Sequence, residues 1–295
     1  MLMKIIVTIP AYNEERTIGR VIQDIKTVMD KTRYNYKILV IDDGSTDKTA
    51  FAAKNSGAIV YSHPKNYGLA ETFRSEIEKC LELKADIIVH TDADGQYLAE
   101  DIPKLIEEVK KGNHLVLGSR FKGKIESMPL IKRLGNIAFS KVVSQVSGIK
   151  ISDAQTGFRA FTNSAAKKIK ITSTHTYTQE QIIRAVKHKF KIKEVPVYFA
   201  KRHGKSRLMR SPFEYALKAW VNILRIYRDY EPLKFFGLFG FVFFVLGFLL
   251  GLYLIYIFLT TGIVGRIPTV MLSVLLISIG IQIWLFGFFA DMSKK

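Results

Sequence analysis

The chain has only one cysteine among its 295 residues, which argues against a scaffold held together by internal disulfides or by cysteine-bound zinc. Cys80 cannot form a disulfide within the chain, and we expect it to be a small buried residue of a helix. The six histidines include no pair at the i, i+4 spacing of a helical metal site, and they have no cysteine partner. A zinc site is therefore not expected.

Two nucleotide-binding signatures are missing as well. No G-x-G-x-x-G follows the first predicted strand, and no G-x-x-x-x-G-K-S/T occurs anywhere in the chain. Both motifs hold phosphates on a glycine-rich loop at a helix N-terminus. The sequence therefore contains neither a dinucleotide-binding fingerprint nor a P-loop.

Charge is absent from two long stretches near the end of the chain, residues 235–259 and 267–290. At about 1.5 Å per residue each stretch extends roughly 36 Å as a helix, which exceeds the hydrocarbon thickness of about 30 Å. We expect a transmembrane hairpin over residues 234–295. A hairpin buried in the core of a soluble protein is the alternative.

The distribution of basic residues predicts the orientation of this hairpin. The connecting loop holds Arg266 alone, whereas the outer flanks of the two spans carry Lys218, Arg225, Arg228, Lys234, Lys294 and Lys295. The positive-inside rule then places both termini in the cytoplasm. Residues 5–9 are typical of a strand and not of a secretory leader, so we expect the N-terminal domain at the cytoplasmic face too.

The chain has 44 Lys and Arg residues against 26 Asp and Glu residues, a formal net charge of +18. Such an excess favours either nucleic acid or anionic lipid and phosphate-bearing substrates as partners. Because two membrane spans follow, we expect membrane lipid as a partner and no nucleic acid.

Apolar runs and helical patterns alternate through residues 1–210, which predicts an α/β domain with a mostly parallel sheet and helices on both faces. The runs typical of strands are residues 5–9, 37–41, 58–61, 87–91 and 114–117. The helical patterns are residues 18–29, 49–53, 69–83, 102–109, 129–146 and 182–189.

Residues 211–233 join this domain to the first span and have the pattern of an amphipathic helix. Leu217, Trp220 and Leu224 form an apolar stripe, and Lys218 and Arg225 lie on the other side. We expect a juxtamembrane helix that lies in the headgroup plane, and packing on the domain core is the alternative.

Two carboxylates, Asp92 and Asp94, come directly after the apolar run 87–91. Gln96 adds a third oxygen donor, and Gly95 allows a tight turn between them. Clustered oxygen donors of this kind suit Mg²⁺ or Mn²⁺, which commonly binds a few carboxylates together with substrate phosphates. A solvated loop is the alternative for a single Asp-x-Asp pair.

Polar residues follow two other predicted strands in the same way. Tyr12 and Glu14 come after the first strand, and Asp42 comes after the second. Asn13 and Ser45 or Thr46 would also suit helix N-caps, which is the alternative interpretation of these loops. Carboxyl ends of parallel strands meet at one edge, where open α/β sheets bind ligands, and capping does not require that convergence.

These segments resemble the successive motifs of family-2 glycosyltransferases with the GT-A fold, a Rossmann-like fold. The matching segments are IPAYNE at 9–14, IDDGSTD at 41–47, NYG at 66–68 and DADGQ at 92–96. Three later segments narrow the resemblance to dolichyl- and polyprenyl-phosphate glycosyltransferases: GSRF at 118–121, DAQTGFR at 153–159 and KRHGKSR at 201–207. The resemblance covers roughly residues 4 to 230.

The resemblance implies roles for particular residues. The nucleotide sugar would contact Pro10, Tyr12, Glu14, Asp42, Asp92, Ala93, Asp94 and Lys205. A divalent metal, Mg²⁺ or Mn²⁺, would be held by Asp92, Asp94 and Gln96. The acceptor phosphate would face Arg120, Arg133, Arg202, Ser206 and Arg207. Of these, Asp94, Arg120 and Arg202 are the expected catalytic residues.

Several of these roles have alternatives. The segment 201–207 could be a polybasic patch that touches anionic headgroups, and Arg133 could extend from its helix to solvent. Gln179 and Glu180 precede a predicted helix, and Glu180 is either an acid favoured at that helix N-terminus or an active-site residue.

The expected reaction is inverting transfer of a hexose from GDP-mannose, UDP-glucose or UDP-N-acetylglucosamine to dolichyl or polyprenyl phosphate. One alternative is transfer to a hydroxyl of a lipid or polysaccharide, with Glu180 as base. The other is a non-catalytic basic membrane adaptor. A G-x-x-x-G at residues 247–251 could pack on Ser273 or Gly280, or join copies of the chain into a homo-oligomer.

Overall fold

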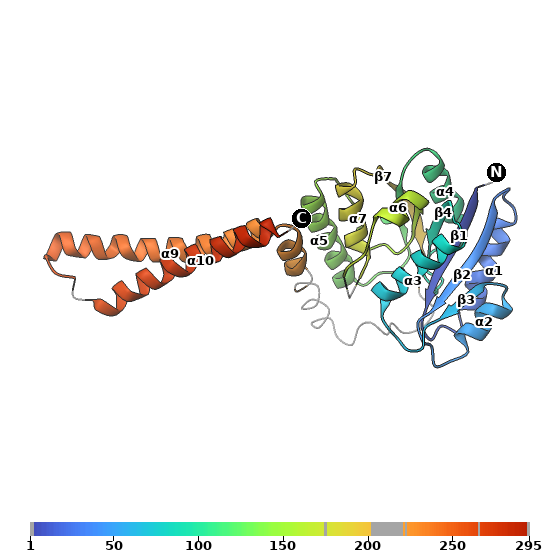
Figure 1. Cartoon of the computed structure of the whole chain (residues 1–295), viewed down its shortest axis with the longest axis horizontal. Helices are drawn as coiled ribbons and strands as arrows, with labels where there is room; N and C mark the ends of the chain where they lie inside the picture. Colours follow the sequence, from blue (N-terminus) through green and yellow to red (C-terminus); the bar gives the residue numbers. More distant parts are fainter. Residues whose placement is uncertain (1–2, 174–175, 202–220, 222, 265, 294–295) are drawn as a thin grey trace. The chain divides into compact units, whose positions relative to one another are not determined.

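The structure is a computed structural model that describes residues 3–173, 176–201, 221, 223–264 and 266–293. The chain divides into two compact units, Met1–Ala216 and Leu217–Lys295 (Figure 1). The first unit contains a β-sheet covered by helices, and the second contains two long helices.

Seven strands form the sheet, in the order β3-β2-β1-β4-β6-β5-β7. β6 is antiparallel to β4 and β5, and the remaining neighbours pair in parallel. The expected mostly parallel sheet is therefore confirmed. The strands are β1 Lys4–Ala11, β2 Asn35–Asp42, β3 Ile59–Ser62, β4 Ile87–His90, β5 Leu115–Ile125, β6 Arg159–Thr162 and β7 Ile192–Phe199.

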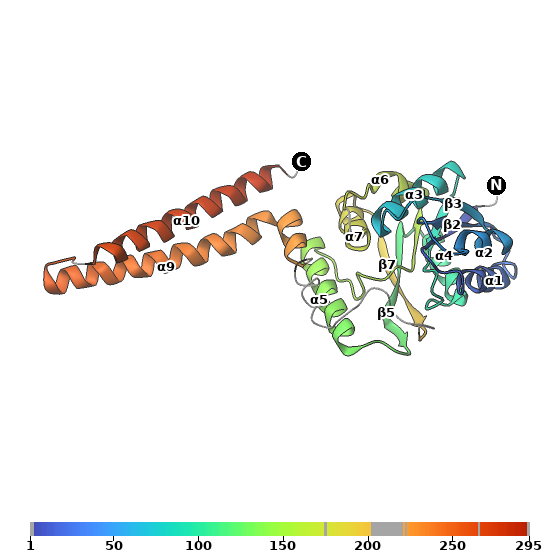
Figure 2. The ribbon, with the colours of Figure 1, turned by 90° about the horizontal axis from the view of Figure 1, so that it is seen from below.

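Helices cover both faces of the sheet (Figures 1 and 2). They are α1 Ile18–Met29, α2 Thr49–Asn55, α3 Leu69–Glu82, α4 Ile102–Lys110, α5 Leu130–Ser147, α6 Asn163–Lys168 and α7 Thr178–Lys187, with a 3₁₀ turn at Ala99–Asp101. Ile5 and Val7 of β1 pack in one apolar cluster with residues of α1 and α4. Thr8 points to the opposite face, where its hydroxyl donates to Glu76 of α3.

Some elements differ from the sequence-based expectation. The strand expected at 114–117 continues to Ile125, and the helix expected at 182–189 begins at Thr178. The sequence pattern does not predict β6, which has only four residues, or β7, which contains Pro196. Proline removes a donor from a strand, and β7 tolerates it because β7 lies at the edge of the sheet.

The second unit contains α9 Pro232–Thr261 and α10 Ile267–Met292, which are long and apolar enough to cross a membrane, with mean hydropathies of 2.7 and 2.2. Only 11% and 17% of their most apolar windows are buried, which argues against a hairpin in a protein core. Residues 223–230 before α9 are helical, and 211–220 of the expected amphipathic helix lie outside the described residues.

Small residues bring α9 and α10 together. The Ser273 hydroxyl of α10 donates to the Gly247 carbonyl of α9 at 2.8 Å. A Cβ atom on Gly247 would lie 2.8 Å from the Ile277 nitrogen, and one on Gly280 would lie 2.8 Å from the Gly240 carbonyl oxygen. The G-x-x-x-G segment thus packs on Ser273 within the hairpin, as one expected alternative had it.

This packing predicts that alanine at two glycines of α9 affects the stability of the hairpin differently. Gly247→Ala should lower the thermal stability of the hairpin, because the added methyl group meets α10 backbone. Gly237→Ala should leave stability unchanged or raise it by up to about 1 kcal/mol, since nothing lies within 4 Å of that position and alanine favours helix. Thermal unfolding of the detergent-solubilised chain, followed by tryptophan fluorescence, compares them. Equal effects of the two variants would contradict this packing.

Candidate functional site

Three neighbouring strands bring their polar ends to one edge of the sheet. β1 pairs with β2 on one side, with Ala11 opposite Asp42, and with β4 on the other, with Thr8 opposite His90. Tyr12 and Asp92 therefore follow β1 and β4 at the same edge at which Asp42 ends β2. The structure brings these residues together although they lie far apart in sequence.

The loops after β1 and β2 are tied to each other, which corrects the capping interpretation. The N-caps of α1 and α2 are Thr17 and Lys48, and neither makes a side-chain capping bond. The backbone nitrogen of Asn13 instead donates to the Ser45 hydroxyl at 2.8 Å, and that of Thr46 donates to the Asn13 side-chain oxygen at 2.8 Å. These polar residues hold the two loops together across the edge of the sheet.

The adjacent acids Asp42 and Asp43 have different surroundings. Asp42 accepts one hydrogen bond from the Ser45 backbone nitrogen at 3.1 Å. Asp43 is buried like Asp42, but its carboxylate contacts His63 and accepts hydrogen bonds from the backbone nitrogens of Tyr67 and Gly68. Asp43 thus fixes the 66–68 segment, and Asp42 is the acid that the expected nucleotide site would use.

Asp92 and Asp94 lie beyond the end of β4, close enough for their charges to interact. Burial raises the pKa of Asp92 from 3.8 to about 6, and the charge of Asp94 adds to this effect. Such crowding of two carboxylates is relieved when a divalent cation binds between them. The geometry and charge of this pair therefore fit a metal site.

Gln96 supplies an amide rather than a third acid. Its side-chain nitrogen donates to the Ala200 carbonyl at 3.0 Å, so the expected metal contact would have to come from its amide oxygen. Within the described residues no three His, Cys, Asp or Glu side chains cluster as a metal site. The protein donors at this edge are thus two carboxylates and one amide, a set that suits Mg²⁺ or Mn²⁺ completed by phosphate oxygens.

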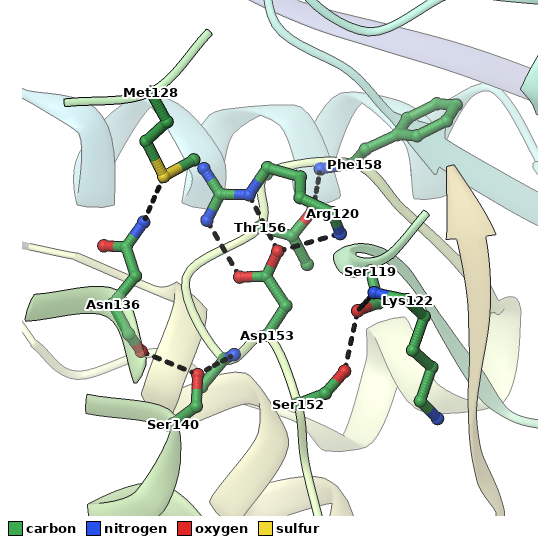
Figure 3. A network of polar contacts seen from close by, with 12 residues as sticks. Ser119, Arg120, Lys122, Met128, Asn136, Ser140, Ser152, Asp153, Thr156 and Phe158 are labelled. Atoms are coloured by element: carbon green, nitrogen blue, oxygen red, sulfur yellow. Dashed lines mark hydrogen bonds and ion pairs between the residues drawn. The ribbon is translucent and has the colours of Figure 1, made fainter. Parts of the chain in front are cut away.

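Arg120 of β5 is held in a bidentate ion pair with Asp153 (Figure 3). Its Nε and Nη2 atoms donate to the two carboxylate oxygens at 2.7 and 2.8 Å, and its backbone nitrogen donates to the same carboxylate at 3.0 Å. Asp153 belongs to the DAQTGFR segment, but nothing in its spacing predicts this partner. The pair fixes the orientation of the guanidinium expected to face an acceptor phosphate.

Gly157 of the same segment packs directly on Asp92. A Cβ atom at position 157 would lie 2.8 Å from an oxygen of Asp92, so only glycine fits there without displacing that carboxylate. The Gly157 carbonyl is bound by the His90 ring at 2.7 Å. Sequence reasoning assigned no role to Gly157, because its constraint comes from a residue 65 positions away.

Two buried side chains, Glu76 and His90, contact each other close to Asp92, because His90 ends β4 two residues before it. Glu76 of α3 approaches the His90 ring at 3.2 Å, and both side chains are fully buried. Burial alone would lower the pKa of His90, but the Glu76 and Asp92 carboxylates and the Gly157 carbonyl together outweigh burial and raise it. The strand that carries Asp92 is thus anchored to α3 as well as to its neighbours.

The residues expected to face the acceptor have different positions. Arg133 lies on α5 and is exposed, next to the exposed apolar side chains of Leu130, Leu134 and Ile137. The buried face of α5 is instead formed by Asn136, Phe139, Ser140, Val142 and Val143. Arg202, Lys205, Ser206 and Arg207 lie outside the described residues.

Glu180 at the start of α7 has a structural role. Its carboxylate accepts hydrogen bonds from the backbone nitrogens of Thr172 and Ser173 and pairs with Arg184 at 2.6 Å. Burial would raise its pKa, but these hydrogen bonds outweigh burial and lower it. The oxygen of Gln179 accepts from the Thr178 hydroxyl. Both Glu180 oxygens are engaged, so the structure gives no basis for a role as general base.

Comparison with known proteins gives consistent matches. The family Glycosyl transferase family 2 matches residues 6–170. A dolichyl-phosphate hexose transferase of Haloferax volcanii is 32% identical over 222 residues, 75% of this chain and 92% of that protein. A UDP-N-acetylglucosamine–dolichyl-phosphate N-acetylglucosaminyltransferase of Methanococcus voltae is 33% identical over 213 residues, 64% of this chain and 82% of that protein.

Solved structures with the same fold are more distant in sequence. A crystal structure of glucosyl-3-phosphoglycerate synthase from Mycobacterium tuberculosis, in complex with Mn²⁺, UDP and glucosyl-3-phosphoglycerate, superposes with a TM-score of 0.60. The match has 20% identity and covers 76% of this chain and 79% of that chain. It confirms the GT-A fold of the first unit.

Glu180 generates a prediction about acid stability. Its pKa in the folded chain lies below the ordinary value near 4.5, so its stabilising contribution is present above that pH and is lost as pH falls. Glu180→Gln should lower the free energy of unfolding by about 1–3 kcal/mol near pH 7, and the deficit should shrink below about pH 4. Thermal unfolding of the solubilised chain across this pH range measures it.

Glu100→Gln is the control, because Glu100 is exposed in the 3₁₀ turn before α4. It should change stability by less than about 0.5 kcal/mol at any pH. A deficit in Glu180→Gln that does not depend on pH would contradict the role given to the carboxylate.

Proposed function

Because the chain belongs to glycosyltransferase family 2, we propose that it transfers a hexose from a nucleotide diphosphate sugar to dolichyl or polyprenyl phosphate. The chain is a glycosyltransferase, and its homologues include enzymes named for dolichyl-phosphate acceptors. The proposal rests on one observation: residues 153–159 contact both Arg120, through Asp153, and Asp92, through Gly157. GDP-mannose, UDP-glucose and UDP-N-acetylglucosamine are the candidate donors.

The donor would bind at the edge formed by β1, β2 and β4. Pro10, Tyr12, Glu14 and Asp42 would hold the base and ribose, and Ala93 would line the diphosphate site. Asp92, Asp94 and Gln96 would bind Mg²⁺ or Mn²⁺, as the paired carboxylates and the raised pKa of Asp92 favour. When bound, the cation would neutralise charge on the leaving diphosphate. The M. tuberculosis synthase, which has the same fold, was crystallised with Mn²⁺ and UDP, and this supports a divalent cation and a nucleoside diphosphate as the bound groups.

The acceptor phosphate would bind at Arg120 and Arg133. By the family resemblance, Arg202, Ser206 and Arg207 would add contacts to that phosphate and Lys205 would contact the donor. A phosphate monoester has a second pKa of about 6 and is largely ionised near neutral pH, so the attacking oxygen needs no strong base. This agrees with the engagement of Glu180 by backbone nitrogens and Arg184. The exposed apolar side chains beside Arg133 suit the lipid chain of such an acceptor.

The reaction then consists of one displacement. An oxygen of the acceptor phosphate attacks the anomeric carbon, the bond from that carbon to the diphosphate oxygen breaks, and the nucleoside diphosphate leaves with the electron pair. The configuration at the anomeric carbon inverts. Arg120 and Arg202 would align and neutralise the acceptor phosphate, and Asp94 would act at the donor side.

The second unit would anchor this reaction to a membrane. We propose that α9 and α10 span the bilayer with both termini and the first unit at the cytoplasmic face, as the basic flanking residues favour. Residues 211–233 would lie at the interface and bring the site to its lipid acceptor. A homo-oligomer through the membrane helices stays a separate prediction.

Removal of one expected metal ligand tests the donor site. Asp94→Asn should abolish transfer and should also abolish the rise in melting temperature that Mn²⁺ and a nucleoside diphosphate produce together. With the nucleotide at about a hundred times its Kd, the wild-type chain should gain about 2.7 kcal/mol. Asp86→Asn is the control, because Asp86 lies at the opposite end of β4 and bonds to Lys4. Normal turnover by Asp94→Asn with metal chelated would contradict the mechanism.

The acceptor is tested with a panel of radiolabelled nucleotide sugars and membranes that contain the full chain. Label should appear in an acid-labile lipid phosphate product with polyprenyl phosphate and not with polyprenol. Label in polyprenol alone would favour a hydroxyl acceptor. Absence of labelled lipid from every donor would overturn the proposed function.

A further inference from the structure

Arg159 at the start of β6 is a fully buried arginine that makes no ion pair among the described residues, although the charge of Asp153 acts on it. Its guanidinium donates to neutral oxygens: the carbonyls of Thr156 at 2.8 Å, Ala154 at 3.0 Å and Thr178 at 2.7 Å, and the Gln181 side chain at 2.9 Å. It also lies over the Tyr177 ring, 5.5 Å from its centre. A buried charge is costly unless every donor is satisfied, so this arrangement needs an explanation beyond core filling.

The acceptors of Arg159 come from two parts of the chain. Ala154 and Thr156 belong to the segment between α5 and β6, and Thr178 and Gln181 belong to the first turn of α7. The planar guanidinium holds these carbonyls in a fixed geometry that the single ammonium of lysine does not reproduce. Through these hydrogen bonds Arg159 fixes the segment 153–158 to α7.

The segment 153–158 contacts both parts of the proposed site, Arg120 on the acceptor side and Asp92 on the donor side. At one end, Asp153 holds the Arg120 guanidinium in a bidentate pair (Figure 3). Near the other end, Gly157 packs on Asp92, because a Cβ atom at position 157 would lie 2.8 Å from the Asp92 carboxylate. Between them, the Thr156 hydroxyl contacts the hydroxyl of Tyr97, the residue after Gln96, at 3.2 Å.

We propose that Arg159 is a positioning residue: it fixes the segment 153–158, which sets the spacing between the Asp92 edge and Arg120. The inference rests on the proposed function, because that spacing separates the donor diphosphate from the acceptor phosphate. A displacement of about 1 Å in such an arrangement can cost about a hundredfold in rate. Arg159 itself touches neither substrate.

The test compares Arg159→Lys with Arg74→Lys in the full chain. Arg74 is the control, because its guanidinium also donates to two backbone carbonyls, those of Ile171 and Ser173, at 3.2 Å each, although Arg74 is half-buried and also pairs with Glu71. Those carbonyls belong to a segment that does not contact Asp92 or Arg120 in the bonds described above. The readouts are melting temperature, the Mn²⁺ concentration for half-maximal nucleotide binding, and kcat and KM for polyprenyl phosphate.

Arg159→Lys should raise the half-maximal Mn²⁺ concentration about tenfold and lower kcat about a hundredfold for each folded molecule. Arg74→Lys should lower the melting temperature and leave both quantities unchanged. A merely structural role for Arg159 predicts that the two variants behave alike once the folded fraction is matched, and that result would overturn the inference. If Arg159→Lys does not fold, Gln181→Leu removes one acceptor and should shift both quantities in the same direction by about threefold.

Nucleotide binding is measured without acceptor, using UDP and GDP, so the two proposals fail in different ways. A wild-type chain that binds neither nucleotide with Mn²⁺ would overturn the proposed function and this inference with it. A wild-type chain that binds one of them, together with an Arg159→Lys variant that is unchanged in metal requirement and kcat, would overturn the inference alone.

Discussion

The bidentate ion pair between Arg120 and Asp153 is the contact on which the arrangement of the site depends. Removal of one partner from such a buried pair costs about 3–5 kcal/mol, because the other charge is left uncompensated. The pair joins β5 to the segment before β6, and that segment also contacts Asp92 through Gly157. Arg120, proposed for the acceptor phosphate, and Asp92, proposed for the metal, are thereby positioned by the same few residues.

Acidic side chains gather at the edge of the sheet that carries the proposed metal site, although the chain as a whole is basic. The chain carries a formal net charge of +18, yet the edge formed by β1, β2 and β4 collects carboxylates. Acids concentrated in a basic protein repel a phosphate unless a cation joins them. Burial raises the pKa of Asp92, and the neighbouring charge of Asp94 raises it further. Beneath that edge, the Glu76–His90 pair and the buried Arg159 hold the strand and the segment in place.

The fold and the acidic edge could be predicted from the sequence because the signals are local. β1 and β4 are continuous apolar runs, and each is followed directly by its polar residues. β7 was not predicted because Pro196 interrupts its strand pattern. The roles of Asp153, Gly157 and Arg159 were not predicted because their contact partners lie far away in sequence. Asn13 and Ser45 were compatible with caps, and only the adjacency of two parallel strand ends shows that they bond to each other.

The central claim is that the metal edge and the phosphate-binding arginine form one site. The most direct measurement is the ³¹P NMR linewidth of a short-chain polyprenyl phosphate bound to the solubilised chain with Mn²⁺ and a nucleoside diphosphate. The acceptor resonance should broaden strongly when protein, Mn²⁺ and nucleotide are all present, and it should stay narrow with Mg²⁺ or in the Asp94→Asn variant. A resonance that remains narrow with saturating Mn²⁺ and nucleotide, although the acceptor is bound, would contradict the claim.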